Sequence, residues 1–281
     1  MNNRVLLGSI ALEPNRWTPD KIPHFDLEKL LPSIARAGFQ GVEVWQFHID
    51  ALSQTELGKV AALAADNRIG FPSLALYPDL QTSTHDNEKN FSDIVQRCVA
   101  LGVNRIKTFS GTESSSDLSE SERDHAMDQL RLLIDVAAED MITVSAELHQ
   151  NSLTDSVEAT LHTLDTIDRP LNVCYQPIDF SSTESTLSDF RRLHETIDHV
   201  HLQGRRSGNF SLLEDADIDY AEFFALAAEL GYSGDYCIEF VEGCIVDQPD
   251  QLDLNKVLDT AARDRDFVFK CLSSATKTAQ K

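Results

Sequence analysis

The sequence predicts a single (β/α)8 barrel, a closed ring of parallel strands in which each strand is followed by a helix. Eight short apolar runs alternate with amphipathic stretches, without a linker between them. The length of 281 residues is close to the roughly 250 residues that such a barrel requires. Polar side chains also stand at the carboxyl ends of late apolar runs, where a barrel places its functional groups.

The predicted strands are short runs rich in β-branched, aromatic and aliphatic residues, bounded by polar or turn-forming segments. In the first half of the chain we expect strands at Val5–Leu12, Gly41–Trp45, Phe71–Tyr77 and Arg105–Phe109. In the second half we expect them at Ile142–His149, Leu171–Gln176, His199–Leu202 and Tyr236–Val241.

The segments between the strands are amphipathic at helical spacing, which predicts helices with one face on the sheet. Residues Gly38, Gly102 and Gly231 follow three of these segments, where a left-handed residue commonly ends a helix. We expect the barrel to cover residues 1–272 and the small polar residues 273–281 to form a flexible tail. The predicted helices are Leu27–Ala37, Glu56–Asp66, Phe91–Leu101, Glu122–Ala138, Val157–Ile167, Leu187–Ile197, Tyr220–Leu230 and Leu254–Leu272.

The charge of the chain argues against two classes of partner. Lys and Arg number 24 against 46 Asp and Glu, which gives a net charge of −22. Such a chain repels phosphate backbones and anionic membrane surfaces, so we expect neither nucleic acid nor membrane as a partner. The five cysteines form no CxxC pair, and no apolar run suggests a signal peptide or a membrane span. We therefore expect a cytoplasmic protein.

Strand alternation directs polar side chains toward the axis of the predicted barrel. In the fifth predicted strand alternate residues up to Glu147 are polar, and those between them are apolar. Because outer helices cover apolar faces, the polar set points inward. A divalent metal ion suits two carboxylates, an imidazole and an amide oxygen at one point, and carboxylates buried there need a cation or a proton. The four strand-end residues that converge in this way are Glu147, Gln176, His201 and Glu239.

Three phrases of the sequence resemble the xylose isomerase-like TIM-barrel superfamily, specifically its sugar phosphate isomerase/epimerase branch. They are AGFQGVEVW at 37–45, IDHVHLQ at 197–203 and GYSGDYCIEF at 231–240. The resemblance extends over almost the whole chain in the same strand order. It implies a TIM barrel and a metal-dependent enzyme of carbohydrate metabolism.

In that family a glutamate, an aspartate, a histidine and a second glutamate hold a divalent ion. The matching positions here are Glu147, Gln176, His201 and Glu239, so glutamine replaces the aspartate. The amide oxygen of Gln176 can still bind a metal, but one negative charge is lost. We therefore expect one ion per chain, Mn²⁺, Mg²⁺, Co²⁺ or Zn²⁺, held more weakly than in the family at large.

The resemblance implies an isomerase or epimerase that acts on a keto- or aldo-sugar or a related polyol. Glu147 and Glu239 match the acid/base pair, which removes a proton next to a carbonyl and returns it through an enediolate. A dehydratase or lyase shares the first half of this path, and a non-catalytic sugar-binding barrel is a third reading. A DNA-repair endonuclease of the same superfamily would need more metal ligands and a less acidic chain. The resemblance also allows a homo-oligomer.

Four further residues are predicted to contact the substrate, and each has a structural alternative. Trp45 is either an apolar platform for a sugar or an aromatic that caps the core. Lys107 points inward and either neutralises a substrate oxyanion or pairs with Glu43 or Glu147. His149 and Arg205 lie on or beyond strand ends, where they either bind the substrate or form ordinary rim contacts. No phosphate-binding glycine loop is present, so a phosphorylated substrate is not required.

Overall fold

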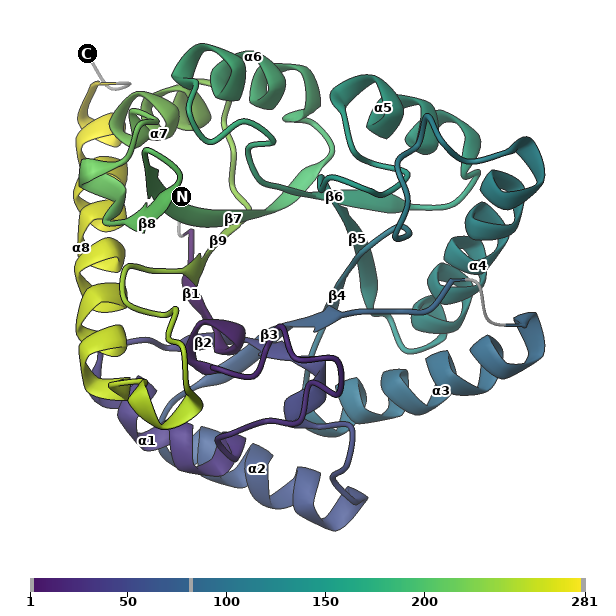
Figure 1. The fold of residues 1–281 in the computed structure, drawn as a ribbon, viewed down its shortest axis with the longest axis horizontal. Helices are drawn as coiled ribbons and strands as arrows, with labels where there is room; N and C mark the ends of the chain where they lie inside the picture. The colour runs from purple at the N-terminus through teal and green to yellow at the C-terminus, as the bar shows by residue number, and fades with distance from the viewer. Residues whose placement is uncertain (1–2, 81–82, 279–281) are drawn as a thin grey trace.

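The structure, a computed structural model, describes residues 3–80 and 83–278. Eight parallel strands close into a ring in the order β6-β5-β4-β3-β2-β1-β9-β7, and β7 pairs with β6. Figure 1 shows this ring with the helices around it. The predicted (β/α)8 barrel is therefore confirmed. The strands are β1 (Val5–Gly8), β2 (Gly41–Trp45), β3 (Gly70–Leu76), β4 (Arg105–Thr108), β5 (Thr143–Glu147), β6 (Leu171–Tyr175), β7 (Ile197–Arg206), β8 (Asn209–Ser211) and β9 (Asp235–Phe240).

The helices of the described chain lie between the strands, as predicted, and polar side chains cap several of their first turns. Ser53 and Ser119 each form a reciprocal capping box, with Glu56 and Glu122 respectively. The helices are α1 (Leu27–Arg36), α2 (Gln54–Asp66), α3 (Thr84–Leu101), α4 (Glu120–Glu139), α5 (Val157–Thr166), α6 (Thr183–Leu193), α7 (Tyr220–Glu229) and α8 (Leu254–Thr278). The predicted left-handed glycines are confirmed by φ values of 84° at Gly38, 73° at Gly102 and 74° at Gly231.

Several predicted boundaries differ from the structure, most among the helices at those predicted for Phe91–Leu101 and Leu187–Ile197, which are Thr84–Leu101 and Thr183–Leu193. The first strand ends at Gly8, because the chain then turns into a 3-10 helix over Ser9–Leu12. Helix α8 continues to Thr278, so residues 273–278 of the expected tail are helical. Small residues such as Ser and Ala have adequate helix propensity, and a helix already formed extends at little cost. Residues 279–281 of the expected tail lie outside the described residues.

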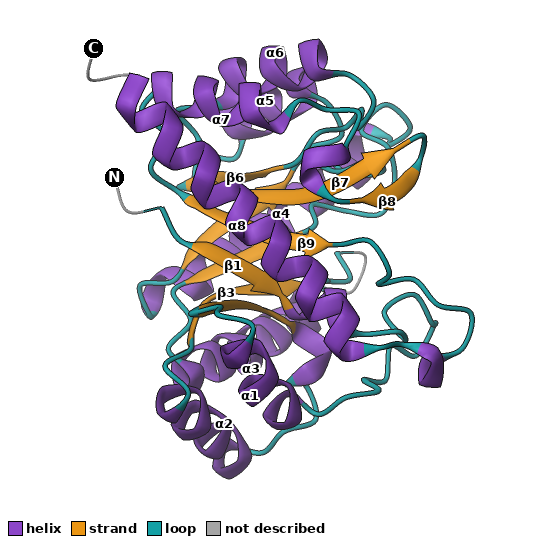
Figure 2. Ribbon diagram, turned by 90° about the vertical axis from the view of Figure 1, so that its left-hand side faces the viewer, coloured by secondary structure: helices purple, strands orange, loops and turns teal. Residues whose placement is uncertain are grey.

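The sequence analysis also missed a hairpin at the carboxyl end of the barrel. Strand β7 continues to Arg206 and pairs antiparallel with β8. Its two-residue turn consists of Ser207 and Gly208, both with positive φ, which matches the twist of a hairpin. In Figure 2 the hairpin projects from the end of the barrel toward which β9 points. It therefore brings Arg205 to the mouth of the barrel.

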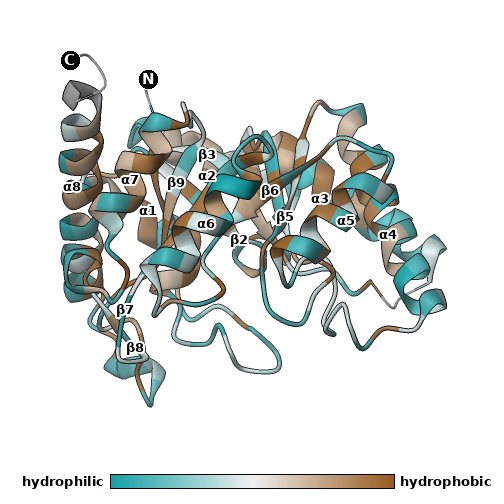
Figure 3. Cartoon of the chain, turned by 90° about the horizontal axis from the view of Figure 1, so that it is seen from above, coloured by the Kyte–Doolittle hydropathy of each residue, from teal (hydrophilic) through white to brown (hydrophobic). Residues whose placement is uncertain are grey.

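The apolar core fills the layer between the barrel strands and the helices. Outward-facing strand residues such as Val144 and Ile238 are fully or almost fully buried there. Figure 3 shows hydrophobic and hydrophilic stretches alternating along the helices, as expected for helices with one covered face. Within the described residues, no helix is both long and apolar enough to cross a membrane.

Candidate metal centre

Three of the predicted metal ligands meet at the carboxyl ends of β5, β7 and β9. The Nδ1 atom of His201 lies 3.2 Å from Oε1 of Glu147 and 3.4 Å from Oε1 of Glu239. One donor atom from each residue lies within 4.8 Å of the other two, and all three side chains are buried. The strand alternation inferred from the sequence thus brings two carboxylates and one imidazole to a common point.

A third carboxylate, Glu43 of β2, fixes the orientation of the His201 ring. Its Oε1 lies 2.8 Å from Nε2 of His201, and its Oε2 lies 2.7 Å from Nε2 of His199. The hydroxyl of Ser73 donates to the same carboxylate at 2.8 Å. With Nε2 facing Glu43, the Nδ1 atom is turned toward Glu147 and Glu239. Carboxylates orient metal-binding histidines in this manner in many proteins.

Lys107 supplies the buried ammonium group of the site. Its Nζ lies 2.6 Å from Oε2 of Glu147, and its side chain is fully buried. The ammonium also lies 4.3 Å from the ring centre of Phe109 and 5.1 Å from that of Tyr77. Of the two ion-pair partners considered for Lys107, the structure selects Glu147. The pair occupies Oε2 of that residue and leaves Oε1 facing His201.

Gln176 and Gln203 connect the carboxylates above the histidine. The amide nitrogen of Gln176 donates to Oε1 of Glu147 at 2.9 Å. The amide nitrogen of Gln203 lies 3.0 Å from Oε1 of Gln176 and 3.3 Å from Oε2 of Glu239. Gln176 therefore lies in the cluster, and in this arrangement its nitrogen rather than its oxygen faces Glu147.

Burial and neighbouring charges act in opposite directions on the pKa values of this cluster. Burial raises the pKa of Glu43, but His201 and His199 hold it well below the usual value. Burial likewise raises the pKa of Glu147, whereas Lys107 and His201 lower it further than burial raises it. Burial lowers the pKa of His201, but Cys174 and the surrounding glutamates raise it well above normal. The three-carboxylate environment thus favours positive charge at the Nδ1 position.

A cavity of about 490 Å³ opens above this cluster at the mouth of the barrel. Four of the predicted site residues line it, namely His149, Gln176, Arg205 and Glu239. Glu147, His201 and Lys107 lie beneath its floor, with no measurable exposed fraction. Tyr77, Phe109, Phe180 and Phe240 add aromatic surface to the walls. The cavity therefore combines an apolar wall with a polar floor, as small-molecule sites commonly do.

Trp45 is not brought to this cavity. Its side chain is 1% exposed and packs against Phe47 and His48, with ring centres 4.9 Å and 5.4 Å away. The chain turns into a 3-10 helix directly after Trp45, which directs the indole into the core. The position matches the core-capping alternative rather than a sugar platform.

Sequence reasoning did not assign three residues that the structure places at the site. Glu43 has the inward parity of β2, between Val42 and Val44, and could have been found by the same alternation argument. Gln203 is two residues beyond His201 on the same strand and shares its face. Arg16 lies in the connection after the 3-10 helix, where no periodic pattern locates a side chain.

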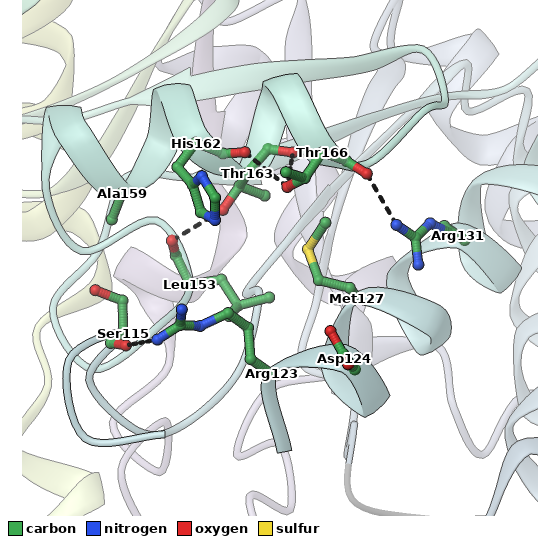
Figure 4. A pocket seen from close by; sticks show the side chains of 10 residues that line it. All are labelled: Ser115, Arg123, Asp124, Met127, Arg131, Leu153, Ala159, His162, Thr163 and Thr166. Carbon is green, nitrogen blue, oxygen red and sulfur yellow. Dashed lines mark hydrogen bonds between the residues drawn. The ribbon is translucent and has the colours of Figure 1, made fainter. Parts of the chain in front are cut away.

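A smaller surface pocket between α4 and α5 does not offer a comparable site. Figure 4 shows its lining, in which the polar groups already serve the fold. Arg123 donates to the carbonyl of Ser115, and Arg131 donates to that of Thr166. The hydroxyl of Thr163 donates to the carbonyl of Leu153. This pocket lies in the helical layer, away from the strand ends that carry the buried carboxylates.

The chain belongs to the xylose isomerase-like TIM barrel family, whose model matches residues 31–260. This match confirms the family predicted from the three sequence phrases.

Individual relatives have different activities. A 3-dehydroshikimate dehydratase from Bacillus anthracis is 26% identical over 186 residues, which cover 62% of this chain and 64% of that protein. The structure of D-psicose 3-epimerase with D-tagatose from Clostridium cellulolyticum H10 superposes with a TM-score of 0.74, at 16% identity, over 96% of this chain and 99% of that one. A xylose isomerase-like protein from Mycobacterium smegmatis in complex with magnesium gives a TM-score of 0.70, at 17% identity, over 98% and 99% of the two chains.

Proposed function

We propose that this protein is a divalent-metal-dependent enzyme that removes a proton from the carbon next to the carbonyl of a sugar or related polyol. The observation that carries the proposal is the placement of a carboxylate oxygen of Glu147 and one of Glu239 at 3.2 Å and 3.4 Å from the Nδ1 atom of His201. Isomerisation or epimerisation is the leading outcome, because the carboxylates match the acid/base pair of the sugar isomerase and epimerase branch.

The residues of the cluster fit a divalent ion. Oε1 of Glu147, Nδ1 of His201 and Oε1 of Glu239 form a compact mixed oxygen and nitrogen donor set. The contact between Glu43 and Nε2 of His201 leaves Nδ1 available as a ligand. Rotation of the Gln176 amide by half a turn would add its oxygen, an arrangement that only a cation beside Glu147 makes favourable.

A bound divalent ion would stabilise the negative charge that develops on the carbonyl oxygen during proton removal. Glu239 borders the cavity and is therefore the carboxylate that can exchange a proton with the substrate directly. Glu147 lies deeper, and its ion pair with Lys107 keeps it ionised and fixed in orientation. Glu239 can thus remove a proton from one carbon and return it at the same or a neighbouring position, while Glu147 would help to hold the ion beside it.

A dehydratase activity is the second candidate. The relative from Bacillus anthracis named 3-dehydroshikimate dehydratase supports it, and so does the position of His149. The Nδ1 atom of His149 contacts the carbonyl oxygen of Gln150 at 2.7 Å, and its ring packs on Phe109. A histidine held in this way at the cavity wall is suited to deliver a proton to a departing hydroxyl group.

Solvent isotope exchange tests the proposal and separates the two outcomes. The Mn²⁺-loaded protein is incubated in D₂O with a panel of keto-sugars and with 3-dehydroshikimate, and the products are followed by NMR. Deuterium at the carbon next to the carbonyl of a recovered or isomeric sugar supports the isomerase reading, whereas loss of a hydroxyl group supports the dehydratase. Glu239→Gln should abolish either reaction, and Glu242→Gln, at an exposed residue in the following turn, should not. A Glu239→Gln variant with native activity would overturn the proposal.

A further inference from the structure

Cations dominate the charged lining of the mouth cavity although the chain is strongly acidic. Among the described residues that line it, Arg16, Lys21 and Arg205 are cationic and Glu239 alone is acidic. The chain as a whole carries a net charge of −22. Cationic side chains gathered at the rim of a cavity in such a chain attract an anionic group to that rim.

Arg205 is held rigidly at one side of the cavity. Its Nε and Nη2 atoms donate to Oε1 of Gln203 at 3.0 Å and 2.8 Å. The guanidinium also lies 4.4 Å from the ring centre of Phe210 and 5.1 Å from that of Phe180. No carboxylate of the described residues forms an ion pair with it, and no hydrogen bond of those residues uses Nη1. A guanidinium fixed in this way loses little conformational entropy when it binds an anion.

Arg16 lies in the β1–α1 connection, beside Phe240, and is also fixed without an acidic partner. It is 2% exposed, and its two terminal nitrogens donate to the carbonyls of Glu13 and Cys244. Its guanidinium lies 4.6 Å from the ring centre of Trp17 and 5.6 Å from that of Phe240. Within the described chain its Nε atom has no hydrogen-bond partner, and Glu13 and Glu239 act on it electrostatically without an ion-pair contact. Burial of a cation in this state is costly unless a ligand compensates it.

Gln203 connects the Arg205 side of the cavity to the acid/base carboxylates. Its oxygen accepts both hydrogen bonds from Arg205, and its nitrogen contacts Gln176 and Glu239. A substrate group that binds Arg205 is therefore placed at a set distance from Glu239. The arrangement can fix which carbon of the substrate faces the carboxylate.

We propose that the substrate carries an anionic group, a carboxylate or a phosphate, which Arg205 and Arg16 bind while its carbonyl end lies over Glu239. The position of the carbonyl end rests on the proposed function, whereas the anion subsite rests on the two arginines alone. The subsite distinguishes an acidic hydroxyketone from a neutral sugar of the same size.

Three ligands with one keto-hexose skeleton test this inference in the Mn²⁺-loaded protein by calorimetric titration. D-fructose is neutral, D-fructuronate carries a carboxylate, and D-fructose 6-phosphate carries a phosphate. At least one anion should bind about tenfold or more tightly than D-fructose, because charge-assisted hydrogen bonds contribute at least that factor. The anion that binds more tightly identifies the group, and its advantage should shrink as salt is raised.

Arg205→Met should remove the preference for the anion, and Arg205→Lys should retain part of it. Arg206→Met is the matched control, because Arg206 is the exposed neighbour on the same strand and carries the same charge. Equal dissociation constants for all three ligands, an absence of binding by all of them, or an unchanged preference in Arg205→Met would overturn the inference. Glu239→Gln should keep the ratio of anion to neutral affinity while it loses proton exchange, so the two proposals fail independently.

Discussion

The two ends of the barrel interior both contain buried charges, but they balance them differently. At the amino ends of the strands, Arg4, Arg105, Asp198 and Asp235 form what we call the basal cluster. Asp235 pairs with Arg4 at 2.7 Å and with Arg105, and Arg105 also lies 3.8 Å from Asp198. Two cations thus face two anions, and Ser145 donates a further hydrogen bond to Asp198 at 2.8 Å.

At the carboxyl ends, Glu43, Lys107, Glu147, His201 and Glu239 form the mouth cluster. Three carboxylates there face one ammonium group, and the balance depends on a proton or an ion beside His201. The charges of the basal cluster balance within the protein, so we assign it a structural role. The mouth cluster needs a further cation and borders a cavity, which is the usual arrangement of a functional site.

The largest effect should follow from Glu239→Gln in the mouth cluster. The amide can neither accept nor return a proton, so turnover should fall by about two to four orders of magnitude. Because Glu239 borders the cavity, thermal unfolding should change little. Product formation by NMR and a thermal melt of the same sample check both parts. A variant that loses stability but keeps its turnover would contradict the assignment.

Asp235→Asn in the basal cluster should have the opposite effect. Arg105 would lose its principal buried partner, so the free energy of unfolding should fall by roughly 3 kcal/mol. Turnover per folded molecule should be unchanged. Urea denaturation measures the loss. Arg4→Met is the control, because removal of the half-exposed Arg4 should lower the free energy of unfolding by less than about 1 kcal/mol.

Glu43→Gln should weaken metal binding without removing a ligand. The glutamine cannot hold a proton on Nε2 of His201 as firmly, so affinity for Mn²⁺ should fall roughly 10- to 100-fold. Titration with Mn²⁺, followed by electron paramagnetic resonance, measures this change. If Glu43→Gln bound Mn²⁺ as tightly as the native protein, Glu43 would not support the metal ligand His201.

A smaller effect concerns Asp264 of α8, a buried carboxylate without a cationic partner within ion-pair distance among the described residues. Burial raises its pKa to about 7, although the amide of Leu213 donates to its Oδ1 at 2.9 Å. Because the folded-state pKa exceeds the unfolded value, the stability that protonated Asp264 contributes is full below about pH 4 and is lost as pH rises from there through about 7. From pH 5 to 8 the native protein should lose about 2–3 kcal/mol more than Asp264→Asn. Urea midpoints at several pH values check this difference, and parallel curves would contradict it.

The sequence predicted the mouth cluster where strand periodicity applies. Every second side chain of a strand shares a face, so Glu147, His201 and Glu239 could be placed from their parity alone. Lys107 was also placed inward, but only the pairing of β4 with β5 decides between its two carboxylate partners. Strand parity could not place Trp45, because β2 ends at that residue and a 3-10 helix follows.

Residues outside the regular elements could not be predicted in this way. Arg16 reaches the cavity from an irregular connection whose path depends on tertiary contacts with the carbonyl of Cys244. The β7–β8 hairpin that carries Arg205 depends on a turn of Ser207 and Gly208, a weak signal in a single sequence. The cation-rich rim of the cavity therefore emerged only with the structure.

Metal content measures the difference between the two clusters most directly. The native protein, Glu239→Gln and Asp235→Asn are loaded with Mn²⁺, dialysed without chelator and subjected to elemental analysis. The account predicts about one equivalent in the native protein and in Asp235→Asn, and little or none in Glu239→Gln. A native protein without metal, or a Glu239→Gln variant that retains a full equivalent, would contradict the assignment of the mouth cluster as a metal centre.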